Sequence, residues 1–458
     1  MLMKFRVSNF MSFGYYENDE GEVVPTEYHL YAGAAEKHKE RIISYGKRKV
    51  LNFSAIYGAN ASGKTNLIFA IDIGGDIVVN TIKDLEIKNC YCRNKKINSE
   101  KPTMFEYEFT IGEHCFAYGF TVNLKEQRVI SEWLYELSDD RQKVIFERIV
   151  LDNKYYYDES IFKNSENIQQ FRYFIEDANR IDTTLLIYEI SRRNMKDEDF
   201  NIFNSVYTWF NTKLLVVYPE TKVANSFKRF SVNNKRLIEL LKYFDTGITD
   251  YNMKELNENA FRQYFTDDDS IDKILPQKFH HGVLKYGNTL FEINRKNKDL
   301  KVKKLMFKHG KDETSYEYGE ESDGTQRLIE LLDVILNDSD DKVFVIDELD
   351  RSFHPQMTIK FVETFLKWAR AKEKNTQLII TTHESDLMDL SLLRRDEIWF
   401  AEKENDNSTK LYTLEKFKIR YDKVVNKDYL AGRYGAVPVF KDFDYLWGEE
   451  ETNGEIEP

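Results

Sequence analysis

The sequence predicts an α/β protein built on a mixed β-sheet, with an antiparallel β lobe and an inserted helical lobe. Three observations predict this fold. Near the C-terminus, short apolar segments typical of buried strands alternate with helical segments, which indicates a parallel sheet. Residues 103–137 alternate between apolar and polar side chains, as antiparallel strands do. Residues 140–277 show mostly helical patterns and few turn residues, which indicates an insertion.

The composition is that of a soluble globular protein. The chain has 458 residues, of which 41% are hydrophobic and 31% charged. No apolar run approaches the roughly 18 residues that a membrane span requires, so we expect a cytoplasmic protein with no membrane contact. Cys90, Cys92 and Cys115 suggest neither a disulfide framework nor a zinc site, because their number is odd and no C-x-x-C pair occurs. The formal net charge of −12 argues against a surface that binds nucleic acid mainly by neutralising phosphates.

Residues 1–139 are expected to hold strands and a phosphate-binding loop. The strand-like segments are MKFRVSNFMSF and KVLNFSAIYG. The sequence GANASGKT then matches the pattern G-x-x-x-x-G-K-[ST] and is followed by the helix-like NLIFAID. In such a loop, backbone N–H groups surround phosphate oxygens, the lysine neutralises the terminal phosphates and the hydroxyl ligates Mg²⁺. The predicted ATP-binding residues are Gly58, Ala59, Asn60, Ala61, Ser62, Gly63, Lys64, Thr65 and Asn66, with Thr65 as a metal ligand.

Residues 140–277 are predicted to form a mostly helical insertion that recognises a partner. Its clearest helical segments are FNIFNSVYTWFNTKLLVVY and SFKRFSVNNKRLIELLKYF. Its aromatic side chains offer either a partner surface or a core for the insertion itself. These aromatic residues include Phe171, Tyr173, Phe174, Tyr207, Trp209 and Phe210. We interpret Asp267, Asp268 and Asp269 as a solvated acidic loop rather than a nuclease metal site, because they lack partner carboxylates at fixed spacing.

Residues 278–448 are expected to complete the core and to supply the catalytic groups. After the strand-like GVLKYGNTLFEINRKN and LKVKKLMF come three buried-strand segments, KVFVID, QLIITT and DEIWFAE. The first of the three ends at Asp347 and Glu348. We predict that Asp347 holds Mg²⁺ through water and that Glu348 polarises the attacking water. His383 follows the second segment and is predicted to contact the γ-phosphate.

A serine and a glycine open the helical pattern that precedes these three strands. They lie in GEESDGTQRLIELL, where the following leucines recur at helical spacing. A serine hydroxyl and a glycine backbone at a helix N-terminus can bind an anion, but a serine there also caps a helix without any ligand. Both interpretations stay open. Residues 449–458 are acidic and are predicted to be a disordered tail.

The order of these motifs resembles the ABC-type ATPase heads of the SMC, Rad50 and RecF class. The resemblance implies a P-loop ATPase that binds ATP and Mg²⁺ and holds two ATP molecules in a head-to-tail dimer. Lys64 and Glu348 would act within one subunit, whereas a signature segment would complete the site of the neighbouring subunit. That signature segment consists of Ser322, Asp323, Gly324 and Thr325.

The sequence departs from this family at several motif positions. Asp323 and Thr325 stand where the common signature has glycine and glutamine, and His354 stands where an aspartate is usual. No glutamine is an obvious Q-loop residue, and Gln127 is the candidate. These departures affect the expected dimer geometry and hydrolysis rate more than ATP binding.

A narrower resemblance extends over nearly the whole chain. The segments NFMSF, GANASGKTNL, FDTGI, ESDGTQRL, VIDELDRSFHP, QLIITTHESDLMD, LRRDEIWFAEK and YLAGRYGAVPVF are similar to those of the AbiL and RloA abortive-infection ATPases. These phage-defence proteins are related to the overcoming-lysogenization-defect (OLD) proteins, in which a Toprim nuclease follows the ATPase. Only 18 residues follow Phe440 here, so the resemblance implies a separate effector, expected to be a nuclease encoded nearby.

These features lead to one favoured function and two alternatives. The favoured function is an anti-phage ATPase switch that senses an infection signal, for example a phage protein, and controls a toxic partner. The first alternative is a RecF- or Rad50-like DNA-maintenance ATPase, and the second is a scaffold in which ATP is structural. The net charge of −12 and the absence of coiled-coil heptads favour the switch, so DNA binding stays open but is not favoured.

Overall fold

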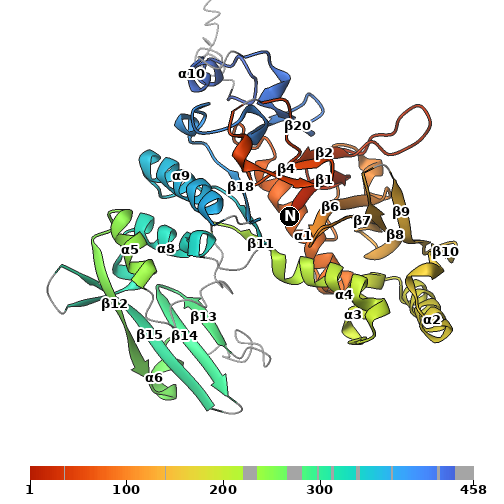
Figure 1. The fold of residues 1–458 in the computed structure, drawn as a ribbon, viewed down its shortest axis with the longest axis horizontal. Coiled ribbons are helices and arrows are strands. Elements are labelled where there is room, and N and C mark those ends of the chain that lie inside the picture. The colour runs from red at the N-terminus through yellow and green to blue at the C-terminus, as the bar shows by residue number, and fades with distance from the viewer. Residues whose placement is uncertain are drawn as a thin grey trace, which may run out of the picture.

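The computed structural model describes residues 1–35, 37–139, 141–219, 235–265, 281–296, 299–310, 314–336, 341–372, 375–419 and 423–438. Within these ranges the chain forms one mixed sheet and two antiparallel sheets, with a small hairpin beside them (Figure 1). The predicted mixed α/β fold is therefore confirmed. The acidic tail and Asp267, Asp268 and Asp269 lie outside the described residues.

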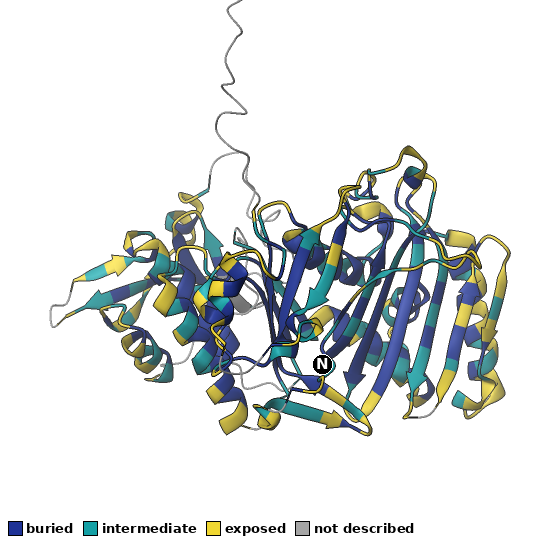
Figure 2. Cartoon of the chain, turned by 90° about the horizontal axis from the view of Figure 1, so that it is seen from above, coloured by how far each residue is buried: buried dark blue, intermediate teal, exposed yellow. Residues whose placement is uncertain are grey.

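A six-stranded mixed sheet forms the centre of the molecule. Its order is β11 (Leu214–Val217), β17 (Val343–Ile346), β18 (Gln377–Thr381), β5 (Phe53–Tyr57), β19 (Ile398–Lys403) and β20 (Thr409–Thr413). The first five strands run parallel, and β20 is antiparallel to β19. Strands β5, β17 and β18 are buried along their whole length, as Figure 2 shows for the middle of the molecule. Burial on both faces explains their nearly continuous apolar sequence.

Helices cover both faces of this sheet. The helix α1 (Lys64–Val79) packs on the face that carries Val343, Val345 and Ile379. The opposite face carries Phe344 and Ile346 and packs against α8 (Asp323–Leu336) and α9 (Pro355–Ala371). Near the C-terminus lies α10 (Val425–Leu430). The carboxyl ends of the parallel strands are thus left open between the helices, where ligands bind in open α/β sheets.

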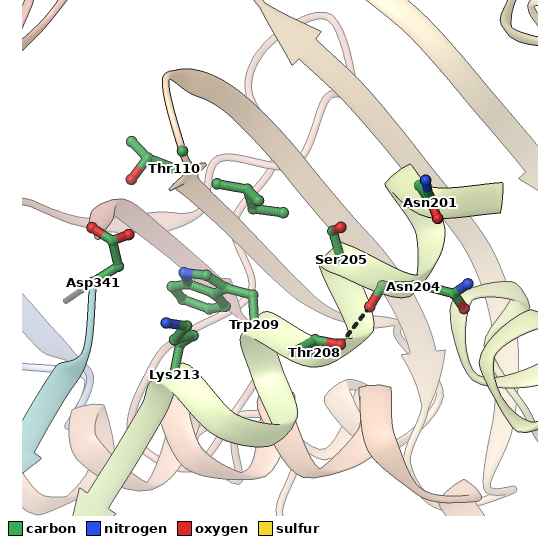
Figure 3. Close-up of a pocket in the computed structure, with 10 residues that line it drawn as sticks. Thr110, Asn201, Asn204, Ser205, Thr208, Trp209, Lys213 and Asp341 are labelled. Atoms are coloured by element: carbon green, nitrogen blue, oxygen red, sulfur yellow. Dashed lines mark hydrogen bonds between the residues drawn. The ribbon is translucent and has the colours of Figure 1, made fainter. Parts of the chain in front are cut away.

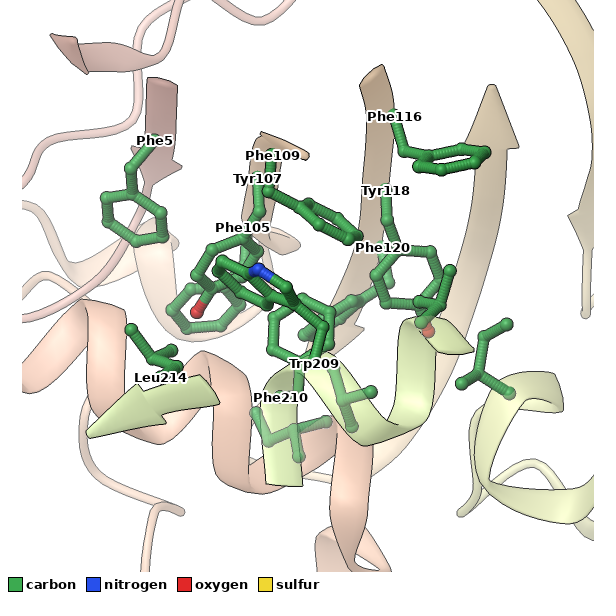
Figure 4. Close-up of a cluster of buried hydrophobic side chains, with 14 of the residues drawn as sticks. Phe5, Phe105, Tyr107, Phe109, Phe116, Tyr118, Phe120, Trp209, Phe210 and Leu214 are labelled. Carbon is green, nitrogen blue, oxygen red and sulfur yellow. The ribbon is translucent and has the colours of Figure 1, made fainter. Parts of the chain in front are cut away.

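A seven-stranded antiparallel sheet packs against α1. Its order is β10 (Lys154–Tyr157), β9 (Gln142–Ile149), β8 (Arg128–Leu137), β7 (His114–Asn123), β6 (Thr103–Ile111), β1 (Leu2–Ser8) and β2 (Thr26–His29). The hairpin of β3 (Ile42–Tyr45) and β4 (Arg48–Leu51) lies beside it. Figure 4 shows aromatic side chains from its inner face gathered around Trp209 and Phe210. The Trp209 ring stacks on Phe109 with centroids 4.4 Å apart.

The middle region contains short strands as well as the predicted helices. Its described helices are α2 (Ser165–Ile181), α3 (Leu186–Arg192), α4 (Asn201–Thr208), a π-helix (Trp209–Lys213), α5 (Lys235–Tyr243) and α6 (Glu258–Arg262). Strands β9, β10, β11 and β12 (Ile248–Leu256) also fall between residues 140 and 277, beside these helices. The sequence predicts the LLVV of β11 as the end of a helix, because periodicity cannot distinguish so short an apolar run from a helical segment. The boundaries of the predicted domains stay a prediction.

A five-stranded antiparallel sheet forms what we call the distal lobe, residues 235–265, 281–296, 299–310 and 314–317. Strand β12 pairs with β15 (Asp299–His309), followed by β14 (Thr289–Lys296) and β13 (His281–Tyr286), while β16 (Ser315–Glu317) also pairs with β15. Figure 1 shows this lobe at the end of the molecule opposite the seven-stranded sheet. Leu305 and Phe307 of β15 share a hydrophobic core with α8 and α9. The lobe is therefore packed on the central sheet through α8.

Most of the aromatic side chains predicted in the insertion are buried. Phe171, Phe174, Trp209 and Phe210 are buried, whereas Tyr173 is 58% exposed. Phe171 packs on Phe203 within the insertion, whereas Trp209 and Phe210 pack on Phe109 of the seven-stranded sheet. In the part of the chain that the structure describes, no helix has both the length and the apolar character needed to cross a bilayer.

A fully buried ion pair joins the seven-stranded sheet to the helices. Arg148 of β9 and Glu132 of β8 are both inaccessible to solvent, with Arg148 Nη2 2.7 Å from Glu132 Oε2. Arg148 also donates to Asn179 Oδ1 at 3.0 Å and to the Thr184 carbonyl at 2.9 Å. The N–H of Leu186, at the start of α3, donates to Glu132 Oε2 at 2.8 Å. This network fixes the junction of α2 and α3 on the sheet.

Candidate nucleotide-binding site

The phosphate loop connects β5 to α1, as the sequence predicts. Gly63 has a φ of 104°, and its backbone precedes the first residue of α1. A Cβ atom on Gly63 would lie 2.0 Å from Thr409 Oγ1. A Cβ atom on Gly58 would lie 2.4 Å from the Ala401 carbonyl oxygen. Both glycines of the motif are therefore required by close approach, and Gly63 also by its backbone conformation.

Ser12 and Thr409, which are not part of the motif, form hydrogen bonds that hold this loop. The Thr409 hydroxyl lies 2.7 Å from Ser12 Oγ and 2.9 Å from the Ser62 carbonyl oxygen. Asn66 donates to Ser12 Oγ at 2.8 Å, and the Thr409 N–H donates to the Ser12 carbonyl at 2.7 Å. Ser12 occurs in NFMSF, which the sequence indicates as the end of a strand-like segment and as part of the family resemblance, but not as part of the site. No sequence pattern pointed to Thr409.

Replacing Gly63 with alanine is expected to weaken ATP binding by about tenfold or more. The added methyl group would collide with Thr409, and an alanine at this φ is strained, which together cost on the order of 1–3 kcal/mol. Titration with a fluorescent ATP analogue measures the loss. Gly112→Ala is the control, because Gly112 also has a positive φ but nothing lies within 4 Å of its added Cβ. Equal ATP affinity in the two variants would contradict this account of the loop.

The two predicted carboxylates lie at the carboxyl end of β17 and share one hydroxyl. Asp347 is buried, and its Oδ1 accepts a hydrogen bond from Thr381 Oγ1 at 2.6 Å. The Glu348 N–H donates to the same hydroxyl at 2.7 Å. The Glu348 side chain is 41% exposed, and its φ of 49° turns it away from the strand. Thr381, which sequence reasoning missed, therefore positions both acidic residues from the neighbouring strand β18.

Lys64 lies near three carboxylates. Asp347 and Glu348 are predicted from the sequence, and Asp350 is not. Its ammonium group donates to the carbonyls of Gly58 at 2.8 Å and Ala59 at 3.1 Å. Burial lowers the pKa of Lys64, whereas the nearby charges of Asp347, Glu348 and Asp350 oppose that shift. The fold thus brings together residues that are almost 300 positions apart in the sequence.

His383 completes this group of charges. The backbone N–H of His383 donates to the Asp350 carboxylate, with its nitrogen 3.2 Å from each carboxylate oxygen. The ring reaches solvent, but the surrounding protein removes part of its water, and this desolvation together with the Lys64 ammonium lowers the pKa of His383. Asp350 was missed in the sequence because it follows the DE pair in a segment that looked like an ordinary turn. Its contact with His383 identifies it as part of the site.

The donor set of this site fits MgATP. The loop offers backbone N–H groups, the Lys64 ammonium and the Ser62 hydroxyl, which is buried without a partner among the described residues. Asp347 has one carboxylate oxygen held by Thr381, and Thr65 is exposed beside the loop. Hydroxyl and carboxylate oxygens are ligands that Mg²⁺ prefers. Thr65 and Asp347 would therefore hold the metal, and the loop with Lys64 would hold the phosphates.

The signature segment lies at the start of α8 and contacts the loop that follows Glu348. Ser322 Oγ accepts from the Thr325 N–H at 3.2 Å, so the serine makes the cap of an ordinary helix. A Cβ on Gly324 would lie 2.9 Å from the Ser352 carbonyl oxygen. Asp323 is the first residue of α8. These contacts are compatible with either interpretation of the segment, and its action on a neighbouring subunit stays a prediction.

The remaining motif candidates have structural contacts. His354 precedes α9 and its Nδ1 accepts from the Gln356 N–H at 3.3 Å. Gln127 donates to the carbonyls of Ile82 and Leu85, just beyond the far end of α1. Because α1 has 16 residues, this end lies about 24 Å along the helix from the phosphate loop. Gln127 therefore lies too far from the phosphate loop of its own chain to act there as a Q-loop residue.

A separate cavity of about 230 Å³ lies beside the π-helix (Figure 3). It is lined by residues of β6, α4 and the π-helix and by Asp341. Figure 3 shows Trp209 between Lys213 and Thr110 at one end of the cavity. None of its lining residues belongs to the phosphate loop, so this cavity is distinct from the nucleotide site.

Comparison with known proteins identifies one family. A family model described as "AAA domain, putative AbiEii toxin, Type IV TA system" matches residues 53–389. The match begins at β5 and ends after His383, so it includes the phosphate loop, the carboxylates and the signature segment. The comparison with curated proteins finds no match.

Proposed function

Because the chain belongs to the P-loop ATPase family described as "AAA domain, putative AbiEii toxin, Type IV TA system", we propose that it is an ATP-hydrolysing switch of an anti-phage defence system. The observation that carries this proposal is the convergence of Lys64, Asp347, Glu348 and His383 at the open edge of the parallel sheet. An AbiL- or RloA-like role is the finer part of the proposal, and it rests on the sequence segments quoted above.

Each residue of the site has one task in the proposed reaction. Lys64 neutralises the terminal phosphates, and Thr65 and Asp347 hold Mg²⁺, which when bound offsets phosphate charge. Glu348 is the half-exposed carboxylate and accepts the proton of the attacking water. His383 contacts the terminal phosphate through its ring in this proposal. Thr381 and Asp350 are positioning residues for these groups.

We further propose that ATP drives two chains into a head-to-tail dimer. Gly324 packs on Ser352, so the signature segment and the loop after Glu348 form one continuous surface. Such a surface could close over the phosphate loop of a second chain. In this arrangement Ser322 and Gly324 of one chain complete the site of the other.

Introducing arginine at Ser322 is expected to prevent this dimer. In a Glu348→Gln background, MgATP should roughly double the mass measured by light scattering, and adding Ser322→Arg should abolish the increase. Nucleotide affinity of the single chain should change little, because Ser322 lies outside the phosphate loop. Ser165→Arg, at the exposed start of α2, is the control and should still dimerise. ATP-dependent association that survives Ser322→Arg would rule out the trans model.

The toxic activity is proposed to belong to a separate effector, for which a nuclease encoded nearby is the first candidate. Cells that carry this chain with its neighbouring gene should resist phage, whereas either gene alone should not. Lys64→Ala should abolish the protection. The purified chain should not cleave DNA or RNA. Cleavage by the purified chain, or protection without any neighbour, would overturn the two-component proposal, and salt-sensitive binding to duplex DNA would favour the DNA-maintenance alternative.

A further inference from the structure

Besides its hydrophobic core, the distal lobe contacts the signature helix α8 through a largely buried carboxylate. Lys285 of β13 forms an ion pair with Glu330 of α8, and the Tyr318 hydroxyl donates to Glu330 Oε1 at 2.6 Å. The Lys285 ammonium also lies 5.3 Å from the centre of the Tyr318 ring. The Glu330 side chain is only 12% exposed, so water screens this contact weakly. Any movement of the lobe relative to α8 must disturb this group.

The same carboxylate continues the contact toward the nucleotide site. Glu330 Oε2 lies 3.6 Å from Arg327 Nη1, one turn earlier on α8. Arg327 Nη2 in turn donates to the carbonyl oxygen of Asp347 at 3.3 Å. Asp347 is the predicted metal ligand. Three charged side chains therefore form an unbroken series of contacts from β13 to the backbone of the metal-binding residue.

Glu330 is the main counter-charge of the buried Arg327 guanidinium. Arg327 is 5% exposed, and its burial lowers its pKa, an effect that the charge of Glu330 opposes more than any other group does. A buried guanidinium without its counter-charge is costly. If Glu330 moved with the lobe or lost its charge, Arg327 would have to shift, and the Asp347 carbonyl would lose its donor.

We propose that the distal lobe controls the ATP site through Lys285, Glu330 and Arg327, which act as positioning residues for Asp347. A partner that displaces the lobe would then change the geometry of the metal ligand without touching the nucleotide. The control of ATP turnover rests on the proposed function, whereas the contacts between Lys285, Glu330, Arg327 and Asp347 are present without nucleotide. The two can therefore be tested separately.

The first test measures hydrogen exchange without nucleotide. The Asp347 N–H donates to the Val217 carbonyl at 2.9 Å and should exchange slowly. We expect Lys285→Met and Glu330→Gln to raise exchange in the peptide 343–349 about threefold or more, because residues linked by such contacts are energetically coupled. Lys301→Met, at an exposed lysine of the same lobe, should leave it unchanged. Equal exchange in all three variants and the wild type would overturn the proposal.

The second test is a double-mutant cycle on ATP turnover. We expect Glu330→Gln to lower kcat about tenfold and Lys285→Met about threefold, with little change in KM. Because both substitutions break one series, the double variant should be no slower than Glu330→Gln alone. Losses that multiply to about thirtyfold would show independent effects and would contradict the series. An inactive wild type that still shows the exchange effect would refute the proposed function and leave this inference standing.

Discussion

Glu348→Gln is expected to slow ATP hydrolysis by about two orders of magnitude or more while ATP binding persists. The glutamine keeps the size of the side chain and the N–H contact to Thr381, but it cannot accept a proton from water. Steady-state phosphate release measures the rate, and a fluorescent ATP analogue measures binding. Lys64→Ala should show the opposite pattern, with binding itself abolished.

The control for this experiment is another glutamate outside the site. Glu363 on α9 is paired with Lys360 and Lys367, and Glu363→Gln should hydrolyse ATP at the wild-type rate. Normal turnover in Glu348→Gln would remove Glu348 from the proposed mechanism. Loss of ATP binding in Glu348→Gln would show a role in binding instead.

Arg148→Met is expected to lower the free energy of unfolding by about 3–5 kcal/mol, because it leaves Glu132 as an unpaired buried charge. Methionine also cannot donate to Asn179 or to the Thr184 carbonyl. Urea denaturation followed by far-ultraviolet circular dichroism measures the change. The loss should exceed that of ordinary surface substitutions several-fold.

Arg128 provides the matched comparison for Arg148. Its ion pair with Asp182 is partly exposed, so Arg128→Met should cost about 1 kcal/mol or less. Adding Glu132→Gln to Arg148→Met should recover part of the lost stability, since it removes the unpaired charge. A single substitution at Arg148 that is as mild as Arg128→Met would show that the buried pair contributes no more than a surface pair.

The sequence predicts those parts of the site that local patterns specify. The phosphate loop is contiguous, so its residues form one recognisable pattern in the sequence. The strand before Asp347 is equally local, because four apolar residues followed by two acidic ones indicate a buried strand that ends at a sheet edge. The structure has the strand β5 before this loop, the helix α1 after it and the strand β17 before Asp347.

The parts that sequence reasoning missed depend on contacts between distant segments. Thr381 and Asp350 act on Asp347, Glu348 and His383 only because β17 and β18 lie side by side. Thr409 reaches the phosphate loop from β20, almost 350 residues away in the sequence. A single hydroxyl or carboxylate carries no pattern, so only the three-dimensional arrangement shows its role. The strand β11 was missed for a related reason, since its four residues follow directly from a helix.

Strand β5 can pair with its neighbours only after most of the chain has been synthesised. Strand β5 ends at Tyr57, yet both of its partners, β18 and β19, come after residue 376. The loop that follows β5 therefore emerges from the ribosome long before the strands that hold it in place. Contacts of such sequence separation form slowly, because a long loop must close before they can stabilise the fold. A nascent chain should thus be unable to bind ATP until most of the protein has been translated, and a prematurely terminated product should lack a working switch.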